Sequence, residues 1–153
     1  MEIQANSIEV KIKISLTYQG ELPSYQTEHA SGLDILAQNE QEIVLKPGER
    51  SLIPTGLFFE IPHGYEIQVR PRSGLAINSG ISLVNSPGTI DADYRGEIKV
   101  ILINHGQDDF VVVRGNKIAQ IVVTPIVRAR FTLSRELSIT ERGSNGFGST
   151  SRK

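Results

Sequence analysis

The sequence predicts an all-β sandwich or barrel that contains one short helix. Three observations support this. Many short apolar segments end at Gly, Pro or Asn, one N-terminal segment alternates cleanly between apolar and polar residues, and no long stretch has helical periodicity. Short strands at such close spacing favour antiparallel sheets over β-α-β units. The length of 153 residues suits one domain. We expect this domain at residues 1–140 and a flexible C-terminal arm at 141–153.

The first expected strand spans residues 9–16, because Val10, Ile12, Ile14 and Leu16 fall on one face of an extended chain. Further apolar runs end at turn residues and are expected as strands at 43–45, 57–61, 65–69, 81–84, 98–103 and 110–113. The short helix is expected at 73–78, between a proline and a Ser-Gly pair. Residues 118–127 form the most apolar stretch, which predicts a strand buried on both faces or against another subunit.

Composition excludes several classes of function. The chain has no Cys, which excludes disulfides, thiolate zinc sites and Cys nucleophiles. A net charge of −1 gives no basic excess for a nucleic-acid backbone, so no nucleic-acid partner is expected. No apolar run approaches the ~20 residues that cross a bilayer, and no secretory signal is visible. We therefore expect a cytoplasmic protein without a membrane partner, in which a few clustered arginines can still bind a small anion.

The first candidate site lies at Arg72 and Ser73. If a helix begins near Ser73, its free N–H groups and positive dipole end favour an anion. Arg72 adds a planar donor that can bind a phosphate through two bonds. The alternative is that Ser73 is an ordinary helix N-cap, which is the commoner role of such a serine.

The second candidate site is the polar segment at residues 85–97. It brings two carboxylates, a Tyr, an Arg and two Gly into one connection between strands. Asp91 and Asp93 would share a face if this chain were extended, so that one could orient a water while the other pairs with an arginine. The alternative is a hairpin turn with solvated charges.

Other polar residues carry weaker signals. Gln120 lies just inside a strand, where a lone Gln is usually structural. His29, His63 and His105 lie near turn residues and are expected on the surface, and their spacing does not match a metal site.

The segment from residue 141 is rich in Gly and Ser and cannot build a core. One interpretation is a disordered terminus. The other is an arm that orders on a ligand, in which Arg142, Ser149 and Thr150 bind phosphates and the flat ring of Phe147 covers a base.

Five segments, in order and at familiar spacing, resemble the motifs of the trimeric dUTPase (deoxyuridine 5'-triphosphate nucleotidohydrolase) family. They are ASGLDI at 30–35, PRSGLA at 71–76, GTIDADYRGE at 88–97, GNKIAQ at 115–120 and RGSNGFGST at 142–150. The resemblance covers nearly the whole chain, and the third and fifth motifs together are highly specific.

This resemblance implies a jelly-roll-like β fold and a homotrimer with three sites, each built from three subunits. It implies a hydrolase that cleaves dUTP to dUMP and pyrophosphate by Mg²⁺-assisted attack of water at the α-phosphate. Such an activity limits uracil incorporation into DNA and supplies dUMP for dTMP synthesis. The β domain would carry most of the site, and the arm would close over it.

The resemblance also implies residue roles. Asp91 would activate the water, although a carboxylate is a weak base near neutral pH and would mainly orient it. Tyr94 would pack under the deoxyribose and leave no room for a 2′-hydroxyl. Asp34 would reach the waters on Mg²⁺. The remaining substrate contacts would be the uracil hairpin with Asn85 and Gly88, the phosphate-binding Arg72, Ser73, Gly74 and Gln120, and the arm residues Arg142, Phe147, Gly148, Ser149 and Thr150.

Some positions depart from the family pattern. Leu33 stands where Tyr is frequent, Lys117 replaces a common Arg, and Asn145 interrupts a usual glycine pair. None of these changes removes a proposed catalytic group, and Asn tolerates left-handed backbone better than most residues.

Two rival functions differ in residues that the sequence contains. A dCTP deaminase of the same fold carries a Glu catalyst and an Arg-Ser-Ser segment, whereas this chain has Asp91 and an Arg-Ser-Gly segment. A binding module that has kept the fold would have lost Asp91, Tyr94 or the arm, and all are present.

Overall fold

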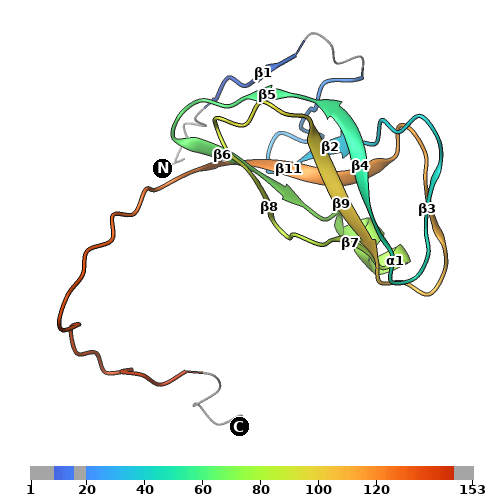
Figure 1. Ribbon diagram of the computed structural model, residues 1–153. Coiled ribbons are helices and arrows are strands. Elements are labelled where there is room, and N and C mark those ends of the chain that lie inside the picture. Colours follow the sequence, from blue (N-terminus) through green and yellow to red (C-terminus); the bar gives the residue numbers. More distant parts are fainter. Residues whose placement is uncertain (1–8, 16–19, 147–153) are drawn as a thin grey trace, which may run out of the picture.

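The computed structural model describes residues 9–15 and 20–146 (Figure 1). Within these ranges the chain forms eleven strands and one helix. The elements are β1 (Lys13–Ile14), β2 (Leu33–Leu36), β3 (Ile43–Leu45), β4 (Arg50–Leu57), β5 (Phe59–Glu60), β6 (Tyr65–Arg70), α1 (Ser73–Ser79), β7 (Ile81–Leu83), β8 (Gly88–Ile90), β9 (Ile98–Asn104), β10 (Phe110–Val112) and β11 (Lys117–Pro125). The prediction of an all-β fold with one short helix is confirmed.

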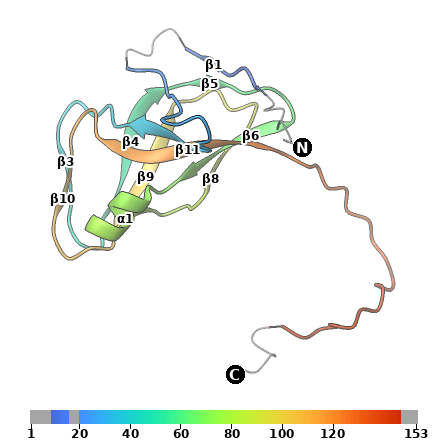
Figure 2. The ribbon, with the colours of Figure 1, turned by 180° about the vertical axis from the view of Figure 1, so that it is seen from behind.

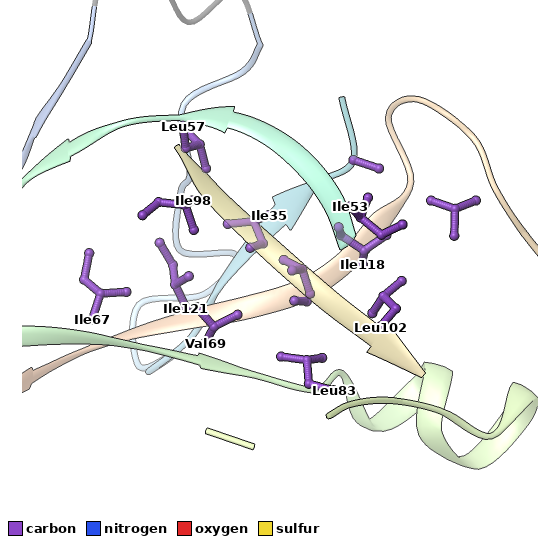
Figure 3. Close-up of a cluster of buried hydrophobic side chains, with 14 of the residues drawn as sticks. Ile35, Ile53, Leu57, Ile67, Val69, Leu83, Ile98, Leu102, Ile118 and Ile121 are labelled. Atoms are coloured by element: carbon purple, nitrogen blue, oxygen red, sulfur yellow. The ribbon is translucent and has the colours of Figure 1, made fainter. Parts of the chain in front are cut away.

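Two antiparallel sheets enclose the core. One has the strand order β2-β11-β6-β8 and the other β4-β9-β7, while β1-β5 and β10-β3 form two-stranded pairs. Alternate residues of each strand point inward. Ile35, Ile67 and Ile121 of the four-stranded sheet therefore face Ile53 and Leu102 of the three-stranded sheet (Figure 3).

Two expected strands differ most in extent from the observed ones. The expected strand at 9–16 is reduced, within the described residues, to β1, which pairs with β5; Leu16 lies outside the described residues. The expected strand at 57–61 is interrupted, because β4 ends at Leu57 and β5 begins at Phe59. The long strand β4 was missed because it contains Pro54 and Gly56, which normally mark turns. Its pairing with β9, with a bulge between Pro54 and Leu57, overrides that local preference.

The helix α1 lies where the sequence predicts it. It ends at Gly80, which has a left-handed φ of 67° and whose N–H binds the carbonyl of Ala76. Arg72 is the N-cap residue and makes no side-chain capping bond, so the alternative in which Ser73 caps the helix is wrong. Among the described helices, none has the length and apolar character needed to span a bilayer.

The apolar strand expected at 118–127 is present as β11, which lies between β2 and β6 and ends two residues earlier. Residues 126–146 contain no strand or helix and lead away from the β domain (Figures 1 and 2). Five large apolar side chains of this segment are almost fully exposed: Val127, Phe131, Leu133, Leu137 and Ile139. This row of exposed side chains was not anticipated from the sequence.

Candidate functional site

The first group of predicted residues surrounds the carboxylate of Asp34, on β2. Arg72, directly after β6, donates from Nε to Oδ1 at 2.9 Å and from Nη2 to Oδ2 at 3.5 Å. Lys117, the first residue of β11, places Nζ 3.0 Å from Oδ2. The three residues are far apart in the sequence and meet because β11 pairs with both β2 and β6.

The charges of this cluster do not balance. Two cations share one half-buried carboxylate, so the cluster keeps a positive excess that suits an anion. The guanidinium of Arg72 is already partly used, because Nη1 also donates to the carbonyl of Lys117 at 3.2 Å. Lys117 was not predicted as a site residue. The only sign of such a role in the sequence is that Lys117 stands where the family commonly has Arg.

Gln120 connects two of the predicted motifs. Its Nε2 donates to the carbonyl of Pro71 at 2.9 Å. Its Oε1 lies 2.3 Å from where a Cβ on Gly32 would stand, so a larger residue at position 32 would displace this amide from its present place. Gln120 thus has a structural role beside Arg72, while Ser73 and Gly74 are exposed at the start of α1.

The second group of predicted residues lines a cavity of about 420 Å³ beside the β8–β9 connection. Its lining includes Asp91 and Tyr94 from that connection, and Leu52, Lys99 and Ile101 from β4 and β9. Tyr94 is 45% exposed, so its ring is accessible from solvent. The cavity therefore offers a carboxylate, an aromatic face and an apolar wall to one small molecule.

The chain turns between the two aspartates. The N–H of Tyr94 donates to the carbonyl of Asp91 at 3.2 Å, and residues 92 and 93 form the turn. The expectation that Asp91 and Asp93 share a face of an extended chain is therefore wrong. Arg95 pairs with neither carboxylate, but donates from Nη1 to the carbonyls of Ala92 and Tyr94 at 2.7 and 2.9 Å.

Asp91 also borders a second cavity, of about 90 Å³, behind the turn. Its lining includes His63, Glu66, Asp93 and Arg128. No ion pair within residues 9–15 and 20–146 involves either aspartate. His29, His63 and His105 are all exposed, as the sequence predicted.

The segment expected to hold uracil as a hairpin begins at Asn85, but β8 pairs with β6, whereas β7 and β9 belong to the other sheet. The segment therefore connects the two sheets and is not a hairpin of paired strands. Gly88 is buried opposite Val69 of β6, and a Cβ on it would stand 3.1 Å from Nδ2 of Asn85. The Asn85 amide therefore folds back over Gly88, toward the end of β6 that leads to Arg72.

The two groups of predicted residues lie at opposite ends of β6. Ile90 pairs with Ile67, and Asp91 continues from there toward the start of β6. Arg72 lies two residues past Arg70, the last residue of β6. A strand advances about 3.3 Å per residue, so the backbones of Asp91 and Arg72 are roughly 15 to 20 Å apart. One chain alone does not bring the carboxylate and the cation cluster to the same point.

The described residues fit a metal only through water or substrate oxygens. None of their His, Asp and Glu side chains gather in a group of three that could hold an ion. The carboxylate of Asp34 already faces two cations. Mg²⁺ usually keeps several waters and is held by one or two carboxylates together with substrate phosphates. Such a water-mediated contact is the arrangement that Asp34 can provide.

The arm is described only as far as residue 146. Arg142 donates from Nε to the carbonyl of Asn145 at 2.9 Å, which closes a local turn around Gly143. The predicted site residues Phe147, Gly148, Ser149 and Thr150 lie outside the described residues.

The chain is similar to known proteins over most of its length. Residues 18–151 match the dUTPase family model. The deoxyuridine 5'-triphosphate nucleotidohydrolase of Bdellovibrio bacteriovorus is 56% identical over 143 residues, which cover 94% of this chain and 96% of that protein.

Solved structures show the same fold. A Staphylococcus bacteriophage 80alpha dUTPase with dUPNHPP has a TM-score of 0.83 at 24% identity, covering 93% of this chain and 99% of that chain. A dUTPase from phage phi11 of S. aureus, with a structural Mg(II) ion, has a TM-score of 0.73 at 22% identity, covering 82% and 97%. From the family match and the extent of identity, the chain belongs to the dUTPase family, whose members are hydrolases.

Proposed function

We propose that this protein hydrolyses dUTP to dUMP and pyrophosphate. The observation that carries the proposal is the 56% identity, over nearly the full length of both chains, to a relative named deoxyuridine 5'-triphosphate nucleotidohydrolase. The cavity that contains Asp91 and Tyr94 supplies a carboxylate for the water and an aromatic ring for the nucleoside.

In this proposal Asp91 accepts a hydrogen bond from a water and orients its oxygen toward the α-phosphorus. The oxygen forms a new bond to phosphorus, and the bond to the bridging oxygen breaks, so that pyrophosphate leaves with the electron pair. The proton of the water passes to Asp91 and then to solvent. Positioning contributes most of the acceleration in such a step, because the carboxylate is a weak base.

The remaining contacts of the proposal hold the substrate. Uracil lies against residues 85–94, and Tyr94 packs under the deoxyribose. The positive cluster around Asp34 attracts the phosphates. The arm then closes over the site. In this proposal residues 1–140 form the β domain and residues 141–153 form the arm. The phosphate ligands proposed on the β domain are Arg72, Ser73, Gly74 and Gln120, and those on the arm are Arg142, Ser149 and Thr150, with Phe147 and Gly148 over the base.

Mg²⁺ is the proposed cofactor. When bound, it would neutralise phosphate charge, and Asp34 would contact its waters. The residues fit this role because the described chain offers one such carboxylate beside cations, rather than a cage of several acids.

The proposed assembly is a homotrimer in which copies share each site. Two observations support it. Asp91 and Arg72 lie toward opposite ends of β6. The triphosphate is short, so its attacked α-phosphorus and its other phosphates cannot reach both residues in a single chain. Residues 126–146 also expose a row of large apolar side chains that a single chain leaves in solvent. In the cell, this activity would lower dUTP and so limit uracil in DNA, and it would supply dUMP for dTMP synthesis in the cytoplasm.

The direct test is pyrophosphate release with dUTP and, separately, with each of the four common dNTPs, in the presence of Mg²⁺. We expect release with dUTP alone. Chromatography of products from dCTP distinguishes the deaminase, which would give dUTP from dCTP without pyrophosphate. Binding of dUTP without any product would support a binding module and would contradict the proposal.

A further inference from the structure

We propose that Gly96 and Glu97 are positioning residues for the ring of Tyr94 and thereby set the selectivity for deoxyribose over ribose. The inference rests on the proposed role of Tyr94 at the sugar. It assigns a role in selectivity to two residues that do not themselves need to touch the substrate.

The ring of Tyr94 is held mainly at its hydroxyl end. With 45% of the residue exposed, packing restrains it only partly. Its hydroxyl donates to the backbone carbonyl of Glu97 at 3.1 Å, so the side chain folds back over its own turn. The orientation of the ring in the cavity therefore depends on the path of the chain through residues 96 and 97.

Gly96 provides the space that this orientation needs. A Cβ at Gly96 would lie 2.3 Å from Oη, 2.5 Å from Cζ and 2.9 Å from Cε2 of Tyr94. The φ of Gly96 is outside the left-handed region, so its backbone conformation does not require glycine. The ring itself therefore excludes a side chain here, and any larger residue must push the ring away from the turn.

Glu97 fixes this turn to the neighbouring strand. Its Oε1 accepts the N–H of Gly56 at 2.9 Å, at the bulge of β4, and its Oε2 lies 3.4 Å from Nζ of Lys99. Gly56 has a φ of 67°, and its N–H is directed at this carboxylate rather than into regular pairing with β9. The carboxylate of Glu97 thus holds the carbonyl that receives the Tyr94 hydroxyl.

A shift of the ring should change the discrimination between deoxyribose and ribose. A reacting group displaced by about 1 Å can cost roughly 10²-fold, and one extra small group in a pocket is typically discriminated by about 10- to 200-fold. A displaced Tyr94 would open space at the 2′ position. The kcat/KM for UTP would then rise relative to the kcat/KM for dUTP.

The experiment compares kcat/KM for dUTP and for UTP in wild type, Tyr94→Ala, Gly96→Ala and the double variant. Gly96→Ala should lower the dUTP/UTP selectivity by about 10- to 100-fold, close to the loss in Tyr94→Ala. In the background without the ring, Gly96→Ala should change the selectivity by less than about twofold, because non-additivity reports contact between the two positions. A merely structural glycine would lower kcat/KM for both nucleotides and leave their ratio unchanged.

Glu97 is tested with a conservative pair. Glu97→Gln keeps an oxygen that can accept the N–H of Gly56 and should retain most of the selectivity. Glu97→Ala removes that acceptor and should lose most of the dUTP/UTP selectivity. Thermal unfolding of each variant establishes that it is folded before its ratio is compared.

A second measurement does not depend on hydrolysis. The chain has four tyrosines, so NMR spectra with ¹³C-labelled tyrosine rings should show signals from four rings. The signal of Tyr94 is identified as the one that is missing from the spectrum of Tyr94→Ala. That signal should shift in Gly96→Ala while the other three stay in place. An unshifted Tyr94 signal, or unchanged selectivity in Gly96→Ala, would overturn the positioning role. A shifted signal in a protein that does not cleave dUTP would support the positioning role and contradict the proposed function instead.

Discussion

Arg72 and Lys117 approach the carboxylate of Asp34 from two strands, and the Nε of Arg72 lies 2.9 Å from Oδ1. The pair of Arg72 and Asp34 is half-buried, with side chains 31% and 20% exposed. The carboxylate thus orders two cations that a single anion can then bind.

Replacing Arg72 should test this cluster. Arg72→Ala should lower kcat/KM for dUTP by about 10- to 100-fold, as expected for one charge-assisted hydrogen bond. Arg72→Lys should rescue little, because lysine lacks the planar fork that contacts Asp34 and a phosphate together. Lys13→Ala is the control, since it breaks a shorter but exposed pair with Glu60, at 2.7 Å. Equal effects of Arg72→Ala and Lys13→Ala would contradict a phosphate role for the cluster.

Asp91→Asn should keep nucleotide binding and lose turnover. Removing one positioned acid–base group typically costs about 10²- to 10⁴-fold in kcat. Binding is measured by calorimetry with a non-hydrolysable dUTP analogue. Asp93→Asn is the matched control, because Asp93 lies in the same turn but does not line the larger cavity. A kcat of Asp91→Asn like that of wild type would remove Asp91 from the mechanism.

The separation along β6 predicts rescue between two impaired chains. Equal amounts of Asp91→Asn and Arg72→Ala are unfolded together and refolded, so that copies mix. If each site takes its aspartate and its arginine from different copies, each requirement is met in about half of the cases, and roughly a quarter of sites should be active. Native mass spectrometry confirms mixed trimers. Activity that stays at the background of the two variants, with mixing confirmed, would show that one chain supplies both residues.

The arm should be dispensable for folding and required for turnover. A chain that ends at Thr140 loses Arg142 and the last motif, but none of the buried core. Its melting temperature should stay near that of the full chain, while kcat/KM falls steeply. A large drop in melting temperature would instead mean that the segment from residue 141 stabilises the fold.

The exposed row in residues 126–146 should mediate association. Phe131 and Leu133 fall on one side of an extended chain, and Thr132 and Ser134 on the other. Phe131→Ser with Leu133→Ser should weaken association by at least about tenfold, since burying one such side chain contributes about 1.5–3 kcal/mol. Thr132→Ala with Ser134→Ala should not. Analytical ultracentrifugation across concentrations makes the comparison, and identical behaviour of the two variants would exclude this row from the interface.

Local signals in the sequence were sufficient for some of these features. The helix, expected at 73–78 and observed at 73–79, was predicted because a proline precedes it and a glycine follows it. The strand β4 was not, because Pro54 and Gly56 signal a turn and only pairing with the distant β9 reveals it. The turn that separates Asp91 from Asp93 was one of two alternatives, because two carboxylates at alternate positions are also typical of one face of a strand.

The geometry of the candidate site depended on contacts between distant segments. Asp34, Arg72 and Lys117 meet only because three strands pair across the sheet. Asp91 and Arg72 are close in sequence and yet far apart, because β8 runs antiparallel to β6. Pattern alone could name these residues, but it could not place them relative to one another.

The distance along β6 has a kinetic consequence. If no single chain holds a complete site, a correctly folded monomer is inactive, and an active site forms only when copies associate. At low protein concentration the rate would then rise more steeply than in proportion to the amount of chain, and it would become proportional only when association is saturated. Dilution would switch the enzyme off reversibly without unfolding it, so its activity would report how much of the chain is present as well as how much substrate there is.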